Sequence, residues 1–319
     1  MVRVLRSPVD ALGCALLPAS CSLCGSHLPR LSSVPICDVC WAEIPVLAGP
    51  ACTLCGDSLD NMHNAGLCRP CRLAPPPFVR AVAYGLYTGR MKDAIHALKY
   101  NRMHPAAQIL GRMLAAAIAQ LAPDRNDAAP KELLVVPIPL HRSRYARRGF
   151  NQARTLARAA LASLAHTHPA WHLALAPSAL MRHRATESQS GLTPRQRRIN
   201  LRGAFTVTDS LAVTGKDILL VDDILTTGAT ARAAALALKK AGANAIYVAT
   251  LARARYEGYY RLHSEADADP PNSTAGVESD SPAINIDKQA IDKQANSQTL
   301  PPVLAPSSRD QQSFLHRSS

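Results

Sequence analysis

Runs of consecutive apolar residues alternate with stretches of helical periodicity through the middle of the chain. Such runs are typical of strands that are buried on both faces of a parallel sheet. The expected strands are 131–139, 171–175, 218–221 and 245–251. The expected helices are 91–100, 105–119, 155–165 and 230–241. Strands that alternate with helices in this way predict an α/β fold built on a doubly wound parallel sheet.

The segments on either side of this region follow other patterns. Residues 79–87 predict an edge strand of the antiparallel type, and three prolines at 75–77 predict a stiff linker at a domain boundary. Residues 12–17 predict a short apolar helix. Pro, Ser, Asn and acids dominate residues 264–319, where the sequence IDKQA occurs twice in succession. This tail is therefore expected to be disordered.

The stretch ILLVDDILTTGAT, residues 218–230, joins a buried strand to polar residues. Asp222 and Asp223 follow its apolar residues, at the end of the strand where open α/β sheets place their ligands. Two adjacent carboxylates can accept hydrogen bonds from a pair of vicinal hydroxyls. The small, hydroxyl-bearing turn 225–230 then aims backbone N–H groups and a helix N-terminus at one point. Together these features predict a site for a ribose 5-phosphate, although a buried strand that ends in a helix-capping Asp is the simpler alternative.

Eight of the nine cysteines form four Cys-x2-Cys pairs, arranged as two repeats. Each cysteine of the second repeat lies 31 residues after its counterpart, and CSLCG at 21–25 is matched by CTLCG at 52–56. Four thiolates at this spacing form a closed tetrahedral Zn²⁺ site, so two structural zinc ions are expected. The ligands are Cys21, Cys24, Cys37, Cys40, Cys52, Cys55, Cys68 and Cys71. The spacing leaves open whether each repeat closes its own site or the pairs interleave.

Disulfides are the competing interpretation of these cysteines. The N-terminus shows no secretory signal, and disulfides are rare in the cytoplasm, so we favour zinc. His27 and His63 lie between the pairs and are expected to be solvated, because the thiolates already fill both sites. Cys14 is expected to be a small buried hydrophobic residue. Zinc should fold this module, which is too short and too rich in Pro and Gly to have much core of its own.

A run rich in arginine follows the expected strand 131–139. The run HRSRYARRGFNQA at 141–153 comes directly after a strand, and planar guanidinium groups bind phosphate oxygens through paired hydrogen bonds. The run predicts either a pyrophosphate site beside the ribose or a solvated basic helix start.

The polar segment 180–205 is too long for a simple turn. It predicts a mobile loop that closes over the site, with a solvated surface loop as the alternative.

Charge is distributed unevenly. The formal net charge is +13 over 319 residues, yet residues 264–319 hold eight acids and four bases. The basic remainder suits a polyphosphate ligand or a nucleic acid backbone, but the 4% aromatic content argues against an extensive base-stacking surface. No run of about twenty apolar residues occurs, so no membrane insertion is expected and a cytoplasmic location is the default.

Several motifs carry a resemblance to known proteins. The stretch 218–230 closely resembles the signature of type I phosphoribosyltransferases, which bind phosphoribosyl pyrophosphate (PRPP) with Mg²⁺. The double cysteine module, ALKY near residue 100, PIPLHRSRYARRGFNQA, the pattern R-x-T-x-x-Q-x-G-L-x(5)-R-x-N and VDDILTTGAT together resemble the ComF family. That family comprises competence-associated, phosphoribosyltransferase-like proteins and GntX-type relatives.

With this resemblance, the chain divides into four expected parts. They are a short N-terminal helix at 1–20, a double zinc-ribbon module at 21–74, a type I phosphoribosyltransferase-like domain at 78–258 and a disordered tail at 264–319. The resemblance implies that Asp222 and Asp223 contact the ribose hydroxyls of PRPP. The residues that it assigns to the rest of PRPP are Leu225, Thr226, Thr227, Gly228, Ala229, Thr230, Leu140, His141, Arg142, Arg184, Gln189, Arg198 and Asn200.

The implied chemistry is loss of pyrophosphate from PRPP and transfer of the ribosyl carbon to an acceptor that the sequence does not identify. No general base is evident. The implied biological role is the handling of single-stranded DNA during uptake or transformation, with single-stranded DNA and competence-machinery proteins as partners. The alternative is a non-catalytic protein that senses PRPP or serves as a scaffold for nucleic acid or protein.

Overall fold

The residues placed by the computed structural model are 19–29, 33–59, 66–100, 105–121, 132–184, 196, 201 and 203–255. The expected helix at 12–17 with Cys14, His63 and the tail at 264–319 lie outside these ranges. So do Gln189, Arg198, Asn200 and most of the expected loop 180–205. Within the ranges, no helix has both the length and the apolar character that a membrane crossing needs.

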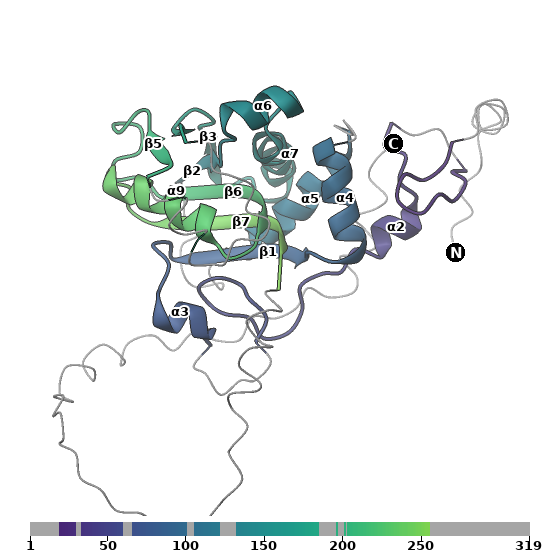
Figure 1. Cartoon of the computed structure of the whole chain (residues 1–319), viewed down its shortest axis with the longest axis horizontal. Coiled ribbons are helices and arrows are strands. Elements are labelled where there is room, and N and C mark those ends of the chain that lie inside the picture. The colour runs from purple at the N-terminus through teal and green to yellow at the C-terminus, as the bar shows by residue number, and fades with distance from the viewer. Residues whose placement is uncertain are drawn as a thin grey trace, which may run out of the picture. The chain divides into compact units, whose positions relative to one another are not determined.

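The described strands form a five-stranded sheet in the order β1-β7-β6-β2-β3, and all neighbours run parallel (Figure 1). The strands are β1 (Arg80–Leu86), β2 (Glu132–Pro137), β3 (His172–Leu175), β6 (Ile218–Leu225) and β7 (Ile246–Arg253). The four strands expected from apolar runs are confirmed. Residues 218–221 of β6 are completely buried, because β6 lies inside the sheet with helices on both faces.

The direction of β1 differs from the expectation. β1 lies at the edge of the sheet, but it pairs parallel with β7, with Arg80 opposite Tyr247 and Leu86 opposite Arg253. The antiparallel expectation was wrong because two helices connect β1 to β2. A helical crossover carries the chain back to the end of the sheet at which the preceding strand began. The strands that it joins therefore run in the same direction.

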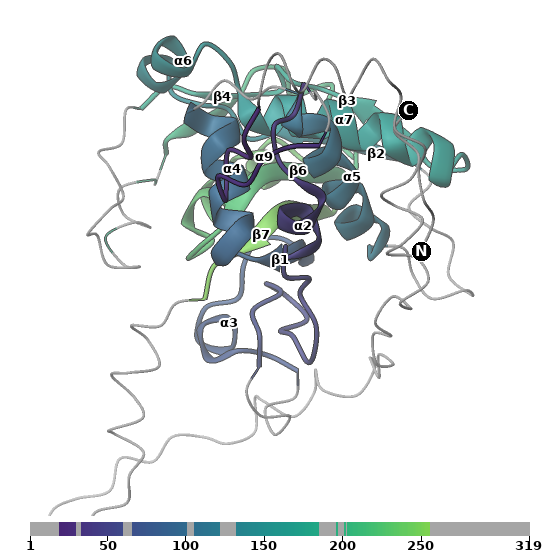
Figure 2. The ribbon, with the colours of Figure 1, turned by 90° about the vertical axis from the view of Figure 1, so that its right-hand side faces the viewer.

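The expected helices are confirmed, and they cover both faces of the sheet (Figure 1). They are α4 (Gly89–Tyr100), α5 (Ala106–Ala119), α7 (Gln152–Thr167) and α9 (Ala229–Lys240). Alternation along β6 separates the two faces: Leu219 and Val221 join the cluster with α4, α5 and α7, whereas Leu220 joins the cluster with α9. In Figure 2 the first three helices lie in front of the strands.

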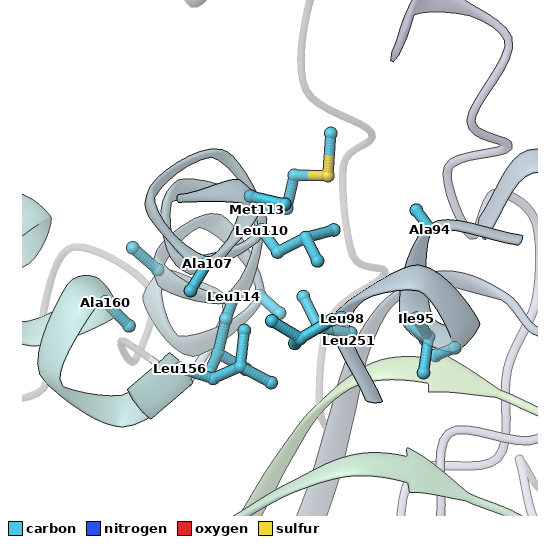
Figure 3. Packing of buried hydrophobic residues seen from close by; sticks show 14 of the residues in the cluster. Ala94, Ile95, Leu98, Ala107, Leu110, Met113, Leu114, Leu156, Ala160 and Leu251 are labelled. Atoms are coloured by element: carbon cyan, nitrogen blue, oxygen red, sulfur yellow. The ribbon is translucent and has the colours of Figure 1, made fainter. Parts of the chain in front are cut away.

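The core of the first face is built from leucine and alanine. Leu98 of α4, Leu114 of α5 and Leu251 of β7 meet in Figure 3 and are completely buried. Alanine lets the helices approach closely: a Cβ added at Gly111 of α5 would lie 2.3 Å from the Cβ of Ala159 in α7. Each buried leucine contributes about 1.5–3 kcal/mol, so this tight packing offsets the scarcity of aromatic residues.

Three shorter elements lie outside the five-stranded sheet and carry or flank several of the expected ligand residues. α6 (Arg142–Arg148) follows β2 and ends at Gly149, whose φ is 79°. β4 (Leu180–Arg182) and β5 (Phe205–Val207) pair antiparallel and bracket the segment 180–205.

The two cysteine repeats have the same backbone hydrogen bonds. The N–H of Cys21 donates to Ser26 O at 2.7 Å, and the N–H of Cys52 donates to Asp57 O at 2.7 Å. Antiparallel bridges join Ser20 to His27 and Ala51 to Ser58. A short helix then follows in each repeat, α2 (Asp38–Ala42) and α3 (Arg69–Leu73), and each begins directly after a cysteine. The internal repeat read from the sequence is therefore a repeat of structure.

Candidate functional site

Asp222 and Asp223 lie inside β6 rather than after it. β6 continues to Leu225 because β7 goes on pairing with it, with Asp222 opposite Thr250. On its other side the last pair joins Val221 to Pro137, where β2 ends. Beyond that pair β6 has lost one neighbour, so the two acids stand beside an open space at the carboxyl edge of the sheet.

Lys99 forms an ion pair with Asp223 in this space. The Lys99 Nζ and Asp223 Oδ2 atoms are 2.5 Å apart, and their side chains are only 14% and 7% exposed. Burial and the neighbouring Asp223 charge raise the pKa of Asp222 to about 8, against the opposing effect of Lys99. Lys99 belongs to the ALKY motif, but the sequence alone assigned it no role. The available signal was a lysine at the end of a helix that is otherwise apolar on one face.

The turn at residues 225–230, called here the Thr-Thr-Gly turn, links β6 to α9. Gly228 is the N-cap of α9 and has φ 71°, a left-handed conformation that glycine adopts without strain. Thr227 Oγ1 accepts a hydrogen bond of 3.4 Å from the N–H of Ala229. Thr226, Thr227 and Thr230 are half-buried. The turn thus carries its hydroxyls directly before the N-terminus of a twelve-residue helix.

A cavity of about 540 Å³ lies between the acids and α6. Its lining includes Lys99, Leu140, Arg144, Arg147, Arg148, Arg182, Asp222, Asp223 and Thr230. The cavity is therefore acidic on the β6 side and strongly basic on the α6 side. An arginine-rich wall of this kind suits a polyanion, because each guanidinium can bind two phosphate oxygens.

Two arginines of this wall are held by aromatic rings. Arg182 is 6% exposed and lies over the Phe205 ring at 5.6 Å from its centroid. Burial, and then the charge of Arg144, lower the pKa of Arg182, so an anion between these cations would be strongly favoured. Arg148 lies over the Tyr100 ring at 5.1 Å and donates to its hydroxyl at 3.1 Å. The cationic groups are therefore placed before any ligand arrives.

The other residues expected at the site are placed as follows. Of Leu140, His141 and Arg142, Leu140 lines the cavity, and His141 caps α6 by accepting a 3.3 Å hydrogen bond from the N–H of Ser143. Arg142 lines a neighbouring cavity of about 720 Å³ on the other side of α6. Arg184 is exposed at the start of the segment 185–195, which the structure does not describe.

The eight paired cysteines form two clusters, one in each repeat. Cys21, Cys24, Cys37 and Cys40 form the first, and Cys52, Cys55, Cys68 and Cys71 form the second. Each repeat therefore closes its own cluster, which settles a question that spacing left open. Within each cluster the Sγ atoms all lie within 4.8 Å of one another.

The distances between these sulfur atoms fit zinc. Cys21 and Cys40 are 3.8 Å apart, Cys24 and Cys37 3.7 Å, and Cys55 and Cys68 3.5 Å. A tetrahedron with Zn–S bonds of about 2.3 Å has sulfur–sulfur edges of about 3.8 Å. His27 is exposed and outside the cluster, as expected.

Comparison with known proteins identifies relatives of both parts. A model of the phosphoribosyl transferase domain family matches residues 107–270, and a model of the double zinc ribbon domain matches residues 13–72. The DNA utilization protein YhgH of Escherichia coli (strain K12) is 34% identical over 183 residues, which are 57% of this chain and 76% of the relative. Competence protein F of Haemophilus influenzae is 29% identical over 237 residues, 73% of this chain and 90% of the relative.

Among solved structures, a hypoxanthine phosphoribosyltransferase from Staphylococcus aureus is 16% identical, with a TM-score of 0.29. The match covers 47% of this chain, and the chain spans 64% of that enzyme.

Proposed function

Because the chain belongs to the ComF family of phosphoribosyltransferase-like proteins, we propose that its arginine-walled cavity binds PRPP together with Mg²⁺ in support of DNA utilization or competence. In this proposal Asp222 and Asp223 accept hydrogen bonds from the two ribose hydroxyls. The Thr-Thr-Gly turn receives the 5′-phosphate, and the pyrophosphate is received by the arginines that line the cavity, Arg144, Arg147, Arg148 and Arg182.

The observation that carries the proposal is the pair of adjacent carboxylates beside Lys99. One lysine balances one negative charge, and the pKa of about 8 at Asp222 shows that a second negative charge is unfavourable there. Hydroxyl donors or a divalent cation would stabilise the second carboxylate. Ribose hydroxyls and Mg²⁺ arrive together with PRPP, so this ligand supplies what the acids need.

The chemistry that fits this site is breakage of the bond between the ribose C1 carbon and pyrophosphate, with a new bond formed to a nucleophile. The protein's contribution would be to position the two reactants and to stabilise charge. Arg144 and Arg182 would hold the departing pyrophosphate, and the acids would hold the ribose. Mg²⁺, when bound, would neutralise charge on the pyrophosphate oxygens.

Calorimetry with PRPP and Mg²⁺ tests the proposal. The wild-type protein should bind, and Asp222→Asn/Asp223→Asn should lower the affinity about a hundredfold or more, because two charged acceptors are lost. Glu132→Gln is the matched control, because Glu132 has an exposed carboxylate paired with Lys216 at the start of β2. Binding by the control and not by the double variant supports the site; no binding by the wild type would show that the proposal is wrong.

The raised pKa of Asp222 also predicts a pH dependence. Below about pH 8 Asp222 holds a proton, and a ligand that needs the ionised carboxylate must expel it. The affinity for PRPP should therefore rise with pH, by up to about tenfold per unit, and level off above pH 8. Binding heats measured in two buffers of different ionisation enthalpy should reveal the released proton. Asp222→Asn should bind without this release, which separates the effect from titration of PRPP itself.

A second candidate function is nucleic acid binding by a non-catalytic scaffold. The observation in its favour is that Arg142, Arg154 and Arg158 line the neighbouring cavity with the half-exposed Tyr145, outside the proposed PRPP site. A salt-dependent affinity for single-stranded DNA that survives Asp222→Asn/Asp223→Asn would support this function. An affinity no greater than that of a neutral control protein would exclude it.

A further inference from the structure

Arg253, the last residue of β7, is buried between the Thr-Thr-Gly turn and the second zinc ribbon. It is 6% exposed and lies opposite Leu225 in the sheet. Its Nη1 atom donates to the carbonyl oxygen of Leu225 at 2.9 Å and also to that of Thr226. The sequence suggested no role for this residue, because it closes an apolar strand 27 positions after Thr226.

These two hydrogen bonds orient the turn. In a trans peptide the C=O of one residue and the N–H of the next point in opposite directions. When Arg253 holds the carbonyls of Leu225 and Thr226, the N–H groups of Thr226 and Thr227 must therefore point away from the guanidinium. Backbone N–H groups that face away from a cation in this way are available as donors to a phosphate.

The other end of the guanidinium is held by the second ribbon. Its Nη2 atom lies 3.3 Å from Asp57 Oδ2 and 3.9 Å from Cys55 Sγ. Asp57 is itself buried, at 6% exposed. The ribbon is also attached to the sheet by a 2.8 Å hydrogen bond from the N–H of Ala81 to Leu54 O. A cationic donor to a sulfur of a four-cysteine cluster is well placed to balance the negative charge of a zinc–thiolate centre.

From this chain of contacts we infer that Arg253 is a positioning residue for the 5′-phosphate turn, and that the second zinc ribbon forms part of the PRPP site by holding Arg253. This inference rests on the proposed PRPP function and adds a component to its site. Arg253 touches no ligand itself. It acts through the Leu225 and Thr226 carbonyls, and Asp57 and Cys55 fix the direction of its side chain.

The chain offers a matched control in Arg90. Arg90 joins the first ribbon to α4 through Glu43 Oε2 at 2.9 Å and Leu23 O at 3.2 Å, as Arg253 joins the second ribbon to the turn. Arg90 stands at the start of α4 and is not among the residues that line the cavity. Arg253→Met and Arg90→Met therefore each remove one guanidinium bridge to a ribbon, but only the first affects the turn.

Calorimetry of the full chain with three ligands in the presence of Mg²⁺ tests the inference. Arg253→Met should weaken binding of PRPP and of ribose 5-phosphate about tenfold, which corresponds to the net contribution of about one hydrogen bond. Binding of pyrophosphate, which lacks the 5′-phosphate, should stay at the wild-type level. Arg253→Lys keeps the charge without the fork and should recover part of the loss. Arg90→Met should match the wild type with all three ligands.

Two results would overturn the inference: equal binding by Arg253→Met and the wild type, or an equal loss for all three ligands, which would indicate general damage. If Arg253→Met does not fold, Asp57→Asn frees the same guanidinium while all eight cysteines remain, and it should show the same selective loss to a smaller degree. Zinc content should be unchanged in each variant.

Hydrogen exchange separates this inference from the proposed function. If the wild type binds none of the ligands, the proposed function fails. The amides of residues 226–230 should still exchange faster in Arg253→Met than in the wild type and in Arg90→Met. Equal exchange in the three proteins would refute the link between Arg253 and the turn.

Discussion

The two zinc ribbons share a motif and a backbone but differ in how they join the rest of the protein. In the first ribbon Cys21, Cys40, Trp41 and Ile44 belong to the same buried cluster as α4, α5 and α7. In the second, the buried cluster consists of Cys52, Cys55, Cys68 and Cys71, with Leu54, Leu59 and Leu67 partly buried beside it. The first ribbon is therefore attached through apolar packing and the second through its metal site and polar contacts.

One pair of equivalent positions accounts for much of this difference. Trp41 is 5% exposed against the core, and the residue 31 positions later is the exposed Arg72. The chain after the first ribbon also crosses β1 closely: Val46 bridges to Gly85, and a Cβ at Gly85 would lie 2.0 Å from Pro45 O. A duplicated zinc motif can thus anchor a domain in one copy and adjoin the proposed PRPP site in the other.

Removing the apolar anchor of the first ribbon should change stability most. Trp41→Ala should lower the free energy of unfolding by about 3–5 kcal/mol, because it leaves a large cavity in the shared core. Arg72→Ala, at the equivalent exposed position, should change it by less than about 0.5 kcal/mol. Denaturant unfolding followed by circular dichroism measures both. Similar losses in the two variants would contradict the difference between the ribbons.

A second expected effect concerns access to the metal sites. Two zinc ions per chain should be found by elemental analysis. Cys24 is exposed and Cys37 half-buried, whereas all four cysteines of the second cluster are buried. A thiol-reactive reagent should therefore label the first cluster before the second and release zinc in two phases, as followed by mass spectrometry and a zinc-sensitive dye. Release in one phase, with both clusters labelled together, would show that burial does not distinguish them.

The smallest expected effect is on the polar contact of the first ribbon. Glu43→Gln removes the 2.9 Å ion pair with Arg90, in which the two side chains are 51% and 29% exposed. Exposed ion pairs contribute little to stability, so the unfolding midpoint should hardly move. Asp57→Asn breaks the buried counterpart with Arg253 and should lower the midpoint clearly. A larger shift of the midpoint for Glu43→Gln than for Asp57→Asn would contradict the conclusion that the first ribbon is attached by apolar packing and the second by polar contacts.

Much of the fold could be predicted because it depends on local patterns. The apolar runs identified four strands of the sheet, and helical periodicity identified α4, α5, α7 and α9. The cysteine spacing predicted both clusters, because tetrahedral coordination requires four thiolates in a short segment. The direction of β1 could not be predicted in the same way, since it depends on the crossover that follows rather than on the residues of the strand.

Only the part of the candidate site that β6 and the Thr-Thr-Gly turn contribute could be predicted from the sequence. Asp222, Asp223 and the Thr-Thr-Gly turn are contiguous in the chain, so their chemistry was visible as a motif. Lys99 and Arg253 were given no role, because each acts on a residue that is remote in sequence and is brought close by the parallel sheet. His141 illustrates the converse: it belongs to a promising basic run, yet its side chain caps α6 instead of lining the cavity.

Sequence patterns were enough to establish the α/β class, the family, the eight paired cysteines and the acidic and hydroxyl-bearing residues of the proposed PRPP site. All of these depend on residues that are neighbours in the chain or repeat at a fixed spacing. The folded chain was needed to show that each repeat closes its own cluster, that Lys99 pairs with Asp223, and that Arg253 connects the second ribbon to the turn. The last two contacts join segments far apart in sequence, and both reach the edge where a parallel sheet brings together the carboxyl ends of its strands.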